Sequence, residues 1–297
     1  MPRALLMVGL LAAVLPAQDG ATVRLQHRFL DREPFAFTIS VDSQSSFEDD
    51  RKNSRMRFLL RFSAIPGAEV DGHTEVACTL QRLTATVEAP NAHIQFDSSD
   101  EGPAIGPLQK LEQLLHAKFL VPVAPDGTLG EVTVPEPLAA IAKDHLGTDF
   151  RSLFAAYFVP LPTKAVAIGD TFDRESMVFG VQTGGTQTLV HHKLLGVTEG
   201  RAELECTFDA EKPTPRPGVR FEVREARGRI AFDLARGRVL RAEAELLARA
   251  TRTGGCGTVS ATSSLLVSAQ LEGAENGTKE IEEPTKRDGK PGNEAGR

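Results

Sequence analysis

A chain of 297 residues with 34 lysines and arginines against 40 aspartates and glutamates has a formal net charge of −6 at pH 7. This mildly acidic balance argues against nucleic acid as a partner, because phosphate binding depends on clustered positive charge. Hydrophobic residues make up 41% of the chain, enough for a globular core, but sixteen Phe with one Tyr and no Trp argue against a carbohydrate-binding surface, which favours Trp and Tyr.

The N-terminus predicts a cleavable secretory signal peptide over residues 1–17. Arg3 supplies a positive start, residues 4–15 contain no charged side chain, and Ala17 is a small residue of the kind that signal peptidase requires. As a helix, this apolar run would rise about 18 Å, well short of the roughly 30 Å hydrocarbon core that an anchor must cross. We therefore expect an exported protein, periplasmic or extracellular, with no later segment apolar enough to span a membrane.

From residue 22 the chain alternates apolar and polar residues with period two, which is typical of half-buried strands. Residues 35–42 and 55–62 show this pattern, the second with arginines on its polar face. Within residues 74–89 the apolar positions are Val76, Cys78 and Leu80, followed by Leu83, Ala85 and Val87. This change of parity predicts a β-bulge near Gln81 and Arg82.

The middle of the chain predicts helices. Leu108, Leu111, Leu114 and Leu115 lie at helical spacing after Pro107. A second helical stretch begins around Pro137, and a third is expected over residues 150–158, behind an N-cap at Asp149. Residues 119–134 predict a hairpin that turns at Pro125-Asp126-Gly127.

Period two returns over residues 201–208, 229–234 and 259–271. A further strand over residues 240–250 differs because its apolar face is mostly alanine. That face consists of Leu240, Ala242, Ala244, Leu246, Ala248 and Ala250. Small inward side chains mean that another element packs close to them or that space is left. The arginines of residues 216–252 alternate with acidic residues, which indicates a solvated outer face.

These elements predict a mainly β (α+β) fold in a single domain over residues 18–271. We expect one large curved antiparallel sheet or half-open barrel, with the helical middle segment covering its concave face. Residues 272–297 contain one large apolar side chain, Ile281, and predict a disordered tail. Residues 75–80 resemble residues 203–208, a match that either two related halves or the chance recurrence of a strand pattern would produce.

Common catalytic signatures are missing from the sequence, among them G-x-S-x-G, G-x-G-x-x-G, H-E-x-x-H and C-x-x-C. We therefore expect a protein that is not an enzyme, with no catalytic residue and no cofactor. His191 and His192 are adjacent, but neighbours in a strand point to opposite faces, so the two rings cannot easily share a metal ion. No metal site is expected.

Two acidic clusters are interpreted as turns. Asp97, Asp100 and Glu101 form a loop that could present oxygen ligands to a cation, but the spacing fits no EF-hand. Asp170 and Asp173 precede a strand and are interpreted as turn formers rather than as paired catalytic carboxylates.

Three cysteines, Cys78, Cys206 and Cys256, are spaced like no metal-binding motif. Disulfides persist in exported proteins, and an odd count leaves at least one thiol unpaired. A bridge between two of the cysteines and three separate buried thiols both fit the sequence.

The order of these parts resembles a family of uncharacterised secreted or periplasmic bacterial proteins, a domain of unknown function. The resemblance is carried by the Ile-Gln-Phe-Asp-Ser-Ser-Asp segment at residues 94–100, the Asp126-Gly127 turn and the Pro-Leu-Pro to Ile-Gly-Asp-Thr-Phe segment at residues 160–172. It covers nearly all of residues 22–271 and implies no catalytic residues. At the level of the fold alone, the strands and turns are also similar to lipoprotein-carrier proteins of the bacterial envelope, which implies a curved sheet with a covered concave face.

The leading hypothesis is an exported protein that binds or carries a lipid or other hydrophobic molecule between the sheet and the helices. The residues predicted to line that site are Leu111, Leu115, Phe150, Phe154, Ala244 and Ala248. The alternative is an envelope scaffold or protein-interaction module, in which the helices simply complete the core. The two hypotheses differ in whether the space between sheet and helices is open or packed.

Overall fold

The structure is a computed structural model that describes residues 22–47, 53–100, 108–136, 138–141, 149–178, 186–209, 219–254 and 257–274. The signal peptide predicted at residues 1–17 lies outside the described residues, as do Cys256 and all of the predicted tail beyond Ala274.

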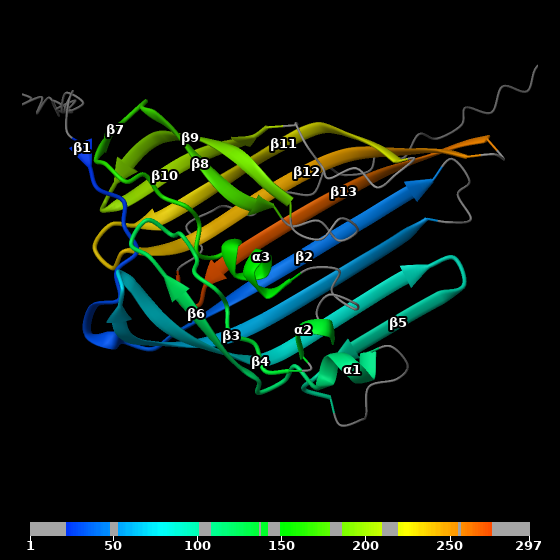
Figure 1. Cartoon of the computed structure of the whole chain (residues 1–297), viewed down its shortest axis with the longest axis horizontal. Helices are drawn as coiled ribbons and strands as arrows, with labels where there is room; N and C mark the ends of the chain where they lie inside the picture. The colour runs from blue at the N-terminus through cyan, green and yellow to red at the C-terminus, as the bar shows by residue number, and fades with distance from the viewer. Residues whose placement is uncertain are drawn as a thin grey trace, which may run out of the picture.

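Within the described residues, eleven strands form one open antiparallel sheet (Figure 1), and the sequence predicts a large antiparallel sheet of this kind. In chain order they are β2 (Phe35–Phe47), β3 (Ser54–Val70), β4 (His73–Ala89), β5 (Ala92–Asp97), β6 (Lys118–Val123), β8 (Thr171–Val178), β9 (Thr186–Thr198), β10 (Arg201–Phe208), β11 (Val219–Asp233), β12 (Arg238–Gly254) and β13 (Gly257–Leu271). Their spatial order is β5-β4-β3-β2-β13-β12-β11-β10-β9-β8, and β6 pairs with the part of β4 that β5 leaves free.

The sheet consists of two meanders, β2 to β5 and β8 to β13, that meet where β2 pairs with β13. Local strand patterns give no information on this seam, which joins residues far apart in the chain, such as Ile39 and Ala269. Residues 75–80 and residues 203–208, which resemble each other in sequence, lie in β4 and β10. Each meander therefore contains one of the two similar segments.

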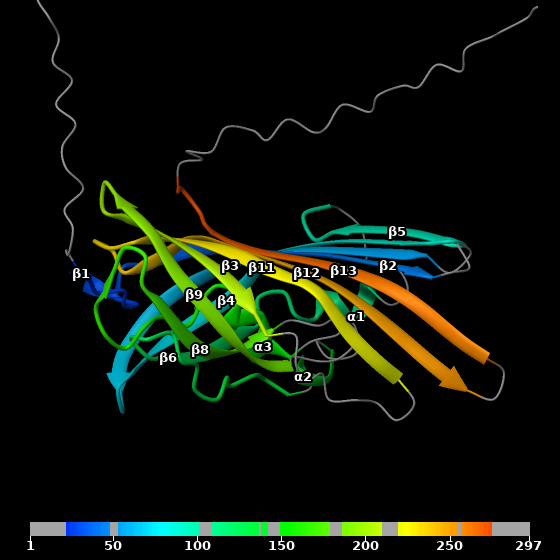
Figure 2. The same cartoon turned by 90° about the horizontal axis from the view of Figure 1, so that it is seen from above.

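In the part of the chain that the structure describes, three short helices lie on one side of the curved sheet (Figure 2). They are α1 (Leu108–Glu112), α2 (Leu138–Ile141) and α3 (Phe150–Ala155). All three coincide with helices that the sequence predicts, although α1 and α3 are shorter than their patterns. A 3-10 turn, η1 (Leu30–Arg32), and a two-stranded sheet of β1 (Thr22–Val23) and β7 (Val166–Ala167) complete the fold.

The alternating pattern correctly predicts which side chains face the helices. In β2 every second residue from Phe35 to Ser45 is buried, and the same holds for β3 from Phe58 to Ala64. The predicted bulge is confirmed, because Arg61 pairs with Arg82 whereas Phe62 pairs with Leu80, which leaves Gln81 unpaired. The parity change therefore keeps the apolar residues of β4 on the inner face throughout.

The predicted turn after β6 is confirmed at Asp126 and Gly127. Gly127 has a φ of +79°, and a side chain there would collide with the carbonyl of Val159. The backbone N–H of Leu161 donates to the carbonyl of Asp126 at 2.8 Å, which ties the turn to the segment after α3. The return arm pairs with β6 only through isolated bridges, Leu120 with Thr133 and Val123 with Leu129.

Candidate ligand-binding site

Helix α3 is positioned by its first residues. The side chain of Asp149 accepts a hydrogen bond from the backbone N–H of Ser152 at 2.7 Å, which satisfies one of the free donors at the helix start. Phe150, Leu153 and Phe154 are buried. The helix therefore presents its apolar face to the inner face of the sheet.

On the β2–β4 side of α3 the interior is filled by aromatic rings. Phe154 lies 5.2 Å from Phe62 and 5.9 Å from Phe119 between ring centroids, and Phe150 lies 4.4 Å from Phe119. Tyr157 stacks on Phe37. The half of the interior between α3 and β2–β4 is therefore packed with side chains. The scaffold alternative expects such packing throughout the space between the sheet and the helices.

On the β10–β13 side of α3 the structure has a largely apolar cavity of about 90 Å³. Residues from α3 and the following turn form one wall, and inner-face residues of the sheet form the other. The lining includes Ser152, Ala155, Ala156, Val159, Val190, His192, Cys206, Ile230, Ala242, Ala244, Leu246, Leu265 and Val267. The space exists because the inner face of β12 carries alanine where β2 and β3 carry phenylalanine.

The six residues predicted to line a site are separated by the structure. Leu111, Phe150 and Phe154 are buried in the core, and Leu115 is half-buried against it. Ala244 lines the cavity, whereas Ala248, on the same strand, is buried but is not among the lining residues. Ligand contact by any of the six remains a prediction.

Five polar residues that the prediction did not include line this cavity, namely Ser152, Ser176, His192, Glu243 and Glu245, and two of them are deeply buried. Ser152 and His192 are 1% and 2% exposed, and neither the Oγ of Ser152 nor the Nδ1 of His192 has a hydrogen-bond partner among the described residues. The His192 ring stacks on Phe172 with centroids 4.7 Å apart. Burial lowers the pKa of His192 to about 4, so the ring is neutral at pH 7. The alternating pattern of β9 predicts that His192 faces inward, because it lies between the apolar residues Val190 and Leu194. The sequence around Ser152 contains no pattern that would predict a cavity.

The two adjacent histidines point to opposite faces, as predicted. His191 lies on the outer face, where its Nδ1 is 2.8 Å from Asp173 and its Nε2 is 3.1 Å from Asp209. The interpretation of Asp173 as a turn former is wrong, because it lies within β8 and pairs across the sheet; Asp170 does form the turn and accepts from the N–H of Ala167 at 2.8 Å. Among the described residues, no group of three or more His, Cys, Asp or Glu side chains could hold a metal ion.

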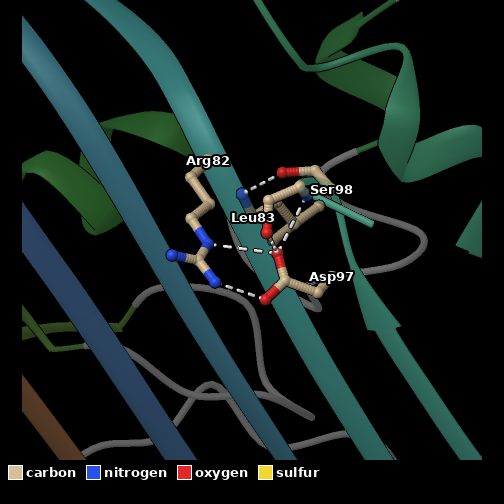
Figure 3. A network of polar contacts seen from close by, with 5 residues as sticks. Arg82, Leu83, Asp97 and Ser98 are labelled. Carbon is tan, nitrogen blue, oxygen red and sulfur yellow. Dashed lines mark hydrogen bonds and ion pairs between the residues drawn. The ribbon is translucent and has the colours of Figure 1, made fainter. Parts of the chain in front are cut away.

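The described part of the acidic loop after β5 ends at Asp100, because Glu101 lies outside the described residues, and in it Asp97 is engaged in hydrogen bonds (Figure 3). The Asp97 carboxylate accepts from Nε of Arg82 at 3.1 Å and from the backbone N–H of Ser99 at 2.9 Å. The Arg82 guanidinium holds the pKa of Asp97 well below its usual range. Ser98 fixes the loop by accepting from the N–H of Leu83 at 3.0 Å. This network supports the interpretation as a turn.

The described cysteines are buried and separate. Cys78 and Cys206 are both free thiols on the inner face. Burial raises the pKa of Cys206, which lines the cavity, to about 12, so it stays a neutral thiol. The structure thus supports buried thiols at these two positions.

A wider hollow of about 610 Å³ lies on the outer side of α3, lined by Leu129, Val132, Asp149 and Arg151 among others. It is more open than the inner cavity, and the chain between two of its lining residues, Ala139 and Asp149, includes residues 142–148, which lie outside the described residues. We therefore assign no site to it.

Comparison with known proteins identifies a fold but no family. Neither a family model nor a curated protein matches the chain. A solved structure of lipovitellin, concerned with its lipid–protein interactions, superposes with a TM-score of 0.52 at 12% sequence identity over 83% of this chain, which spans only 26% of the lipovitellin chain. A structure of OccK5 (OpdH) from Pseudomonas aeruginosa aligns with 80% of this chain and 98% of its own at 8% identity, but its TM-score of 0.22 is too low to inform the fold.

The fold is thus similar to part of a lipovitellin, a weak likeness to a lipid-binding protein at the level of architecture. None of the helices in the described ranges has the length and apolar character needed to cross a bilayer.

Proposed function

We propose that this chain is an exported, non-enzymatic protein that binds a lipid or another hydrophobic molecule in the cavity between α3 and the inner face of β10 to β13. The observation that carries the proposal is the cavity itself, beside an interior region that aromatic rings fill. Protein interiors are normally packed as tightly as organic crystals, so unfilled apolar space costs stability.

Ala242 and Ala244 account for the space. Both line the cavity with small side chains, whereas the aromatic half of the sheet presents the buried rings of Phe37 and Phe62 on its inner face. An apolar cavity tends to stay dry and to accept apolar molecules. A ligand that enters it would recover dispersion contacts that the protein alone lacks.

The similarity to lipovitellin supports the proposal at the level of the fold only, since fold does not fix function. The predicted signal peptide supports an extracytoplasmic place of action. Mass spectrometry of the protein from its native host tests export: a mature chain that begins near Gln18 is expected, and an intact Met1 would contradict it.

Extraction of the purified protein with organic solvent, followed by mass spectrometry, tests ligand binding. We expect a hydrophobic molecule in stoichiometric amount from the wild type and much less from Ala244→Phe, which fills the cavity. The matched control is Ser264→Phe, which adds the same ring on the exposed outer face of β13. If all three proteins carry the same molecules, or none, the proposal fails and the scaffold alternative is favoured.

A further inference from the structure

Two residues that line the cavity each carry one buried side-chain polar atom for which the described chain offers no hydrogen-bond partner. The Oγ of Ser152 comes from α3 and the Nδ1 of His192 comes from β9, and both atoms are buried without a hydrogen-bond partner in the described part of the chain. Buried polar groups are nearly always hydrogen-bonded in native proteins, because leaving one unpaired costs the free energy of removing it from water. Both atoms belong to residues that line one apolar cavity, so a small rotation of either side chain would let a bound molecule complete its hydrogen bonding.

We propose that the cavity binds the uncharged polar end of an amphipathic molecule, a hydroxyl or a carbonyl oxygen, with Ser152 and His192 as its hydrogen-bonding partners. This inference rests on the proposed function and names its ligand class. A hydroxyl suits the pair because it both donates and accepts, and serine and neutral histidine can each take either role.

The charges near the cavity argue against an ionised group. The guanidinium of Arg174 is bonded to the Asp126 carboxylate and, at 3.0 Å, to the hydroxyl of Thr128. Glu243 is paired with Arg241, and Glu245 with Arg227 at 2.8 Å. A carboxylate or ammonium in the cavity would thus find no unpaired opposite charge among the described lining residues, and its desolvation would go uncompensated.

The size of the cavity limits what it holds. Its volume of about 90 Å³ is smaller than the roughly 150 Å³ of an engineered cavity that admits benzene. Only the polar end and the first few carbons of a long molecule fit inside. The rest would lie along Ala244 and Leu246, which are only half-buried on the inner face of β12.

Three probes of equal chain length test the inference: 1-octanol, n-octane and octanoate. Binding is followed by NMR of ¹³C-labelled alanine methyl groups, with Ala242 and Ala244 as reporters. We expect 1-octanol to bind most tightly. In Ser152→Ala the affinity for 1-octanol should fall roughly fivefold, the effect of one neutral hydrogen bond, while the affinity for n-octane stays unchanged.

His192→Phe keeps a ring against Phe172 and removes both nitrogens, and it should lower 1-octanol affinity in the same selective way. Ser43→Ala is the matched control, because it removes a buried hydroxyl from β2, a strand that contributes no residue to the cavity lining. Folding of each variant is checked by urea unfolding. Ser152→Ala should be at least as stable as the wild type without ligand, since it loses an unpaired hydroxyl.

The outcomes separate this inference from the proposed function. If n-octane and 1-octanol bind equally and Ser152→Ala affects neither, the cavity binds apolar chains and the assignment of a polar end is wrong. If octanoate binds best, the ligand is anionic and the inference is overturned. If none of the probes shifts the alanine signals, both the inference and the proposed function fail.

Discussion

The ring of Tyr157 lies parallel to that of Phe37, with centroids 4.1 Å apart and planes 13° apart, yet its hydroxyl has no hydrogen-bond partner in the described chain. Tyr157 is 1% exposed. Burial raises the pKa of the Tyr157 hydroxyl above its usual value, so the group stays neutral and unpaired. The Tyr157 ring therefore stabilises the folded core, whereas its buried, unpaired hydroxyl destabilises it.

Tyr157→Phe is therefore expected to leave stability unchanged or to raise it by up to about 1 kcal/mol, because the stacking remains and an unsatisfied polar group is removed. Phe37→Ala, which deletes the opposing ring, should cost about 3–5 kcal/mol. Urea unfolding of both variants measures these changes. A clear loss of stability in Tyr157→Phe would show that the hydroxyl has a partner after all.

The cap of α3 makes a second prediction. Asp149→Ala removes the acceptor for the N–H of Ser152 and should destabilise the protein by about 1 kcal/mol. Asp149→Asn keeps an acceptor oxygen and serves as the control, with a much smaller expected loss. Because α3 carries Ser152 into the cavity, Asp149→Ala should also weaken 1-octanol binding. Equal stability of the two variants would rule out capping as the role of Asp149.

Acid should destabilise the protein through buried histidines. His27 hydrogen-bonds through Nε2 to the carbonyl of Val159 at 3.0 Å, and burial lowers its pKa from 6.5 to about 4. Below pH 6.5 the unfolded chain binds a proton that the folded chain does not. The stabilisation from neutral His27 is thus fully present above pH 6.5 and is lost as the pH falls toward 4, by roughly 3 kcal/mol. His192 adds to the same trend.

Urea unfolding between pH 7 and pH 4 measures this loss. His27→Gln keeps a side-chain donor for Val159 but does not titrate, so its stability should depend less on pH over that range. The same pH dependence in both proteins would exclude His27 as a source of acid sensitivity.

His191 should behave in the opposite way. Both of its ring nitrogens face carboxylates, which only the protonated ring can satisfy with two donors. Hydrogen bonds to Asp173 and Asp209 raise the pKa of His191 above 6.5. Its contribution to stability is fully present below pH 6.5 and is lost as the pH rises through the raised pKa.

An NMR titration of the imidazole signals measures this pKa directly. Asp209→Asn removes one carboxylate charge and should lower the pKa of His191 toward 6.5, while the buried His27 signal stays unchanged. An unshifted His191 titration in the wild type would mean that the two ion pairs do not form in solution.

Much of the local structure follows from the sequence, because strand and helix patterns depend on residues close together in the chain. The parity change of β4 predicts its bulge at Gln81, and Asp149 predicts the start of α3. Alternation also places His191 and His192 on opposite faces. The regular alternation of β12 conceals a bulge at Leu240, where the register with β11 shifts between Val239 and Arg241.

The site itself depends on contacts that no local pattern contains. The sequence by itself determined an inward alanine face on β12 and an aromatic face on α3, and the obvious interpretation placed both sets of residues in one site. Only the tertiary structure decided that Phe150 and Phe154 pack against Phe62 and Phe119, while Ala244 faces open space. The physical reason is the order of the strands. Pairing of β2 with β13 sets the aromatic and alanine halves on either side of α3, and pairing of β9 with β10 brings His192 into the same cavity as Ser152.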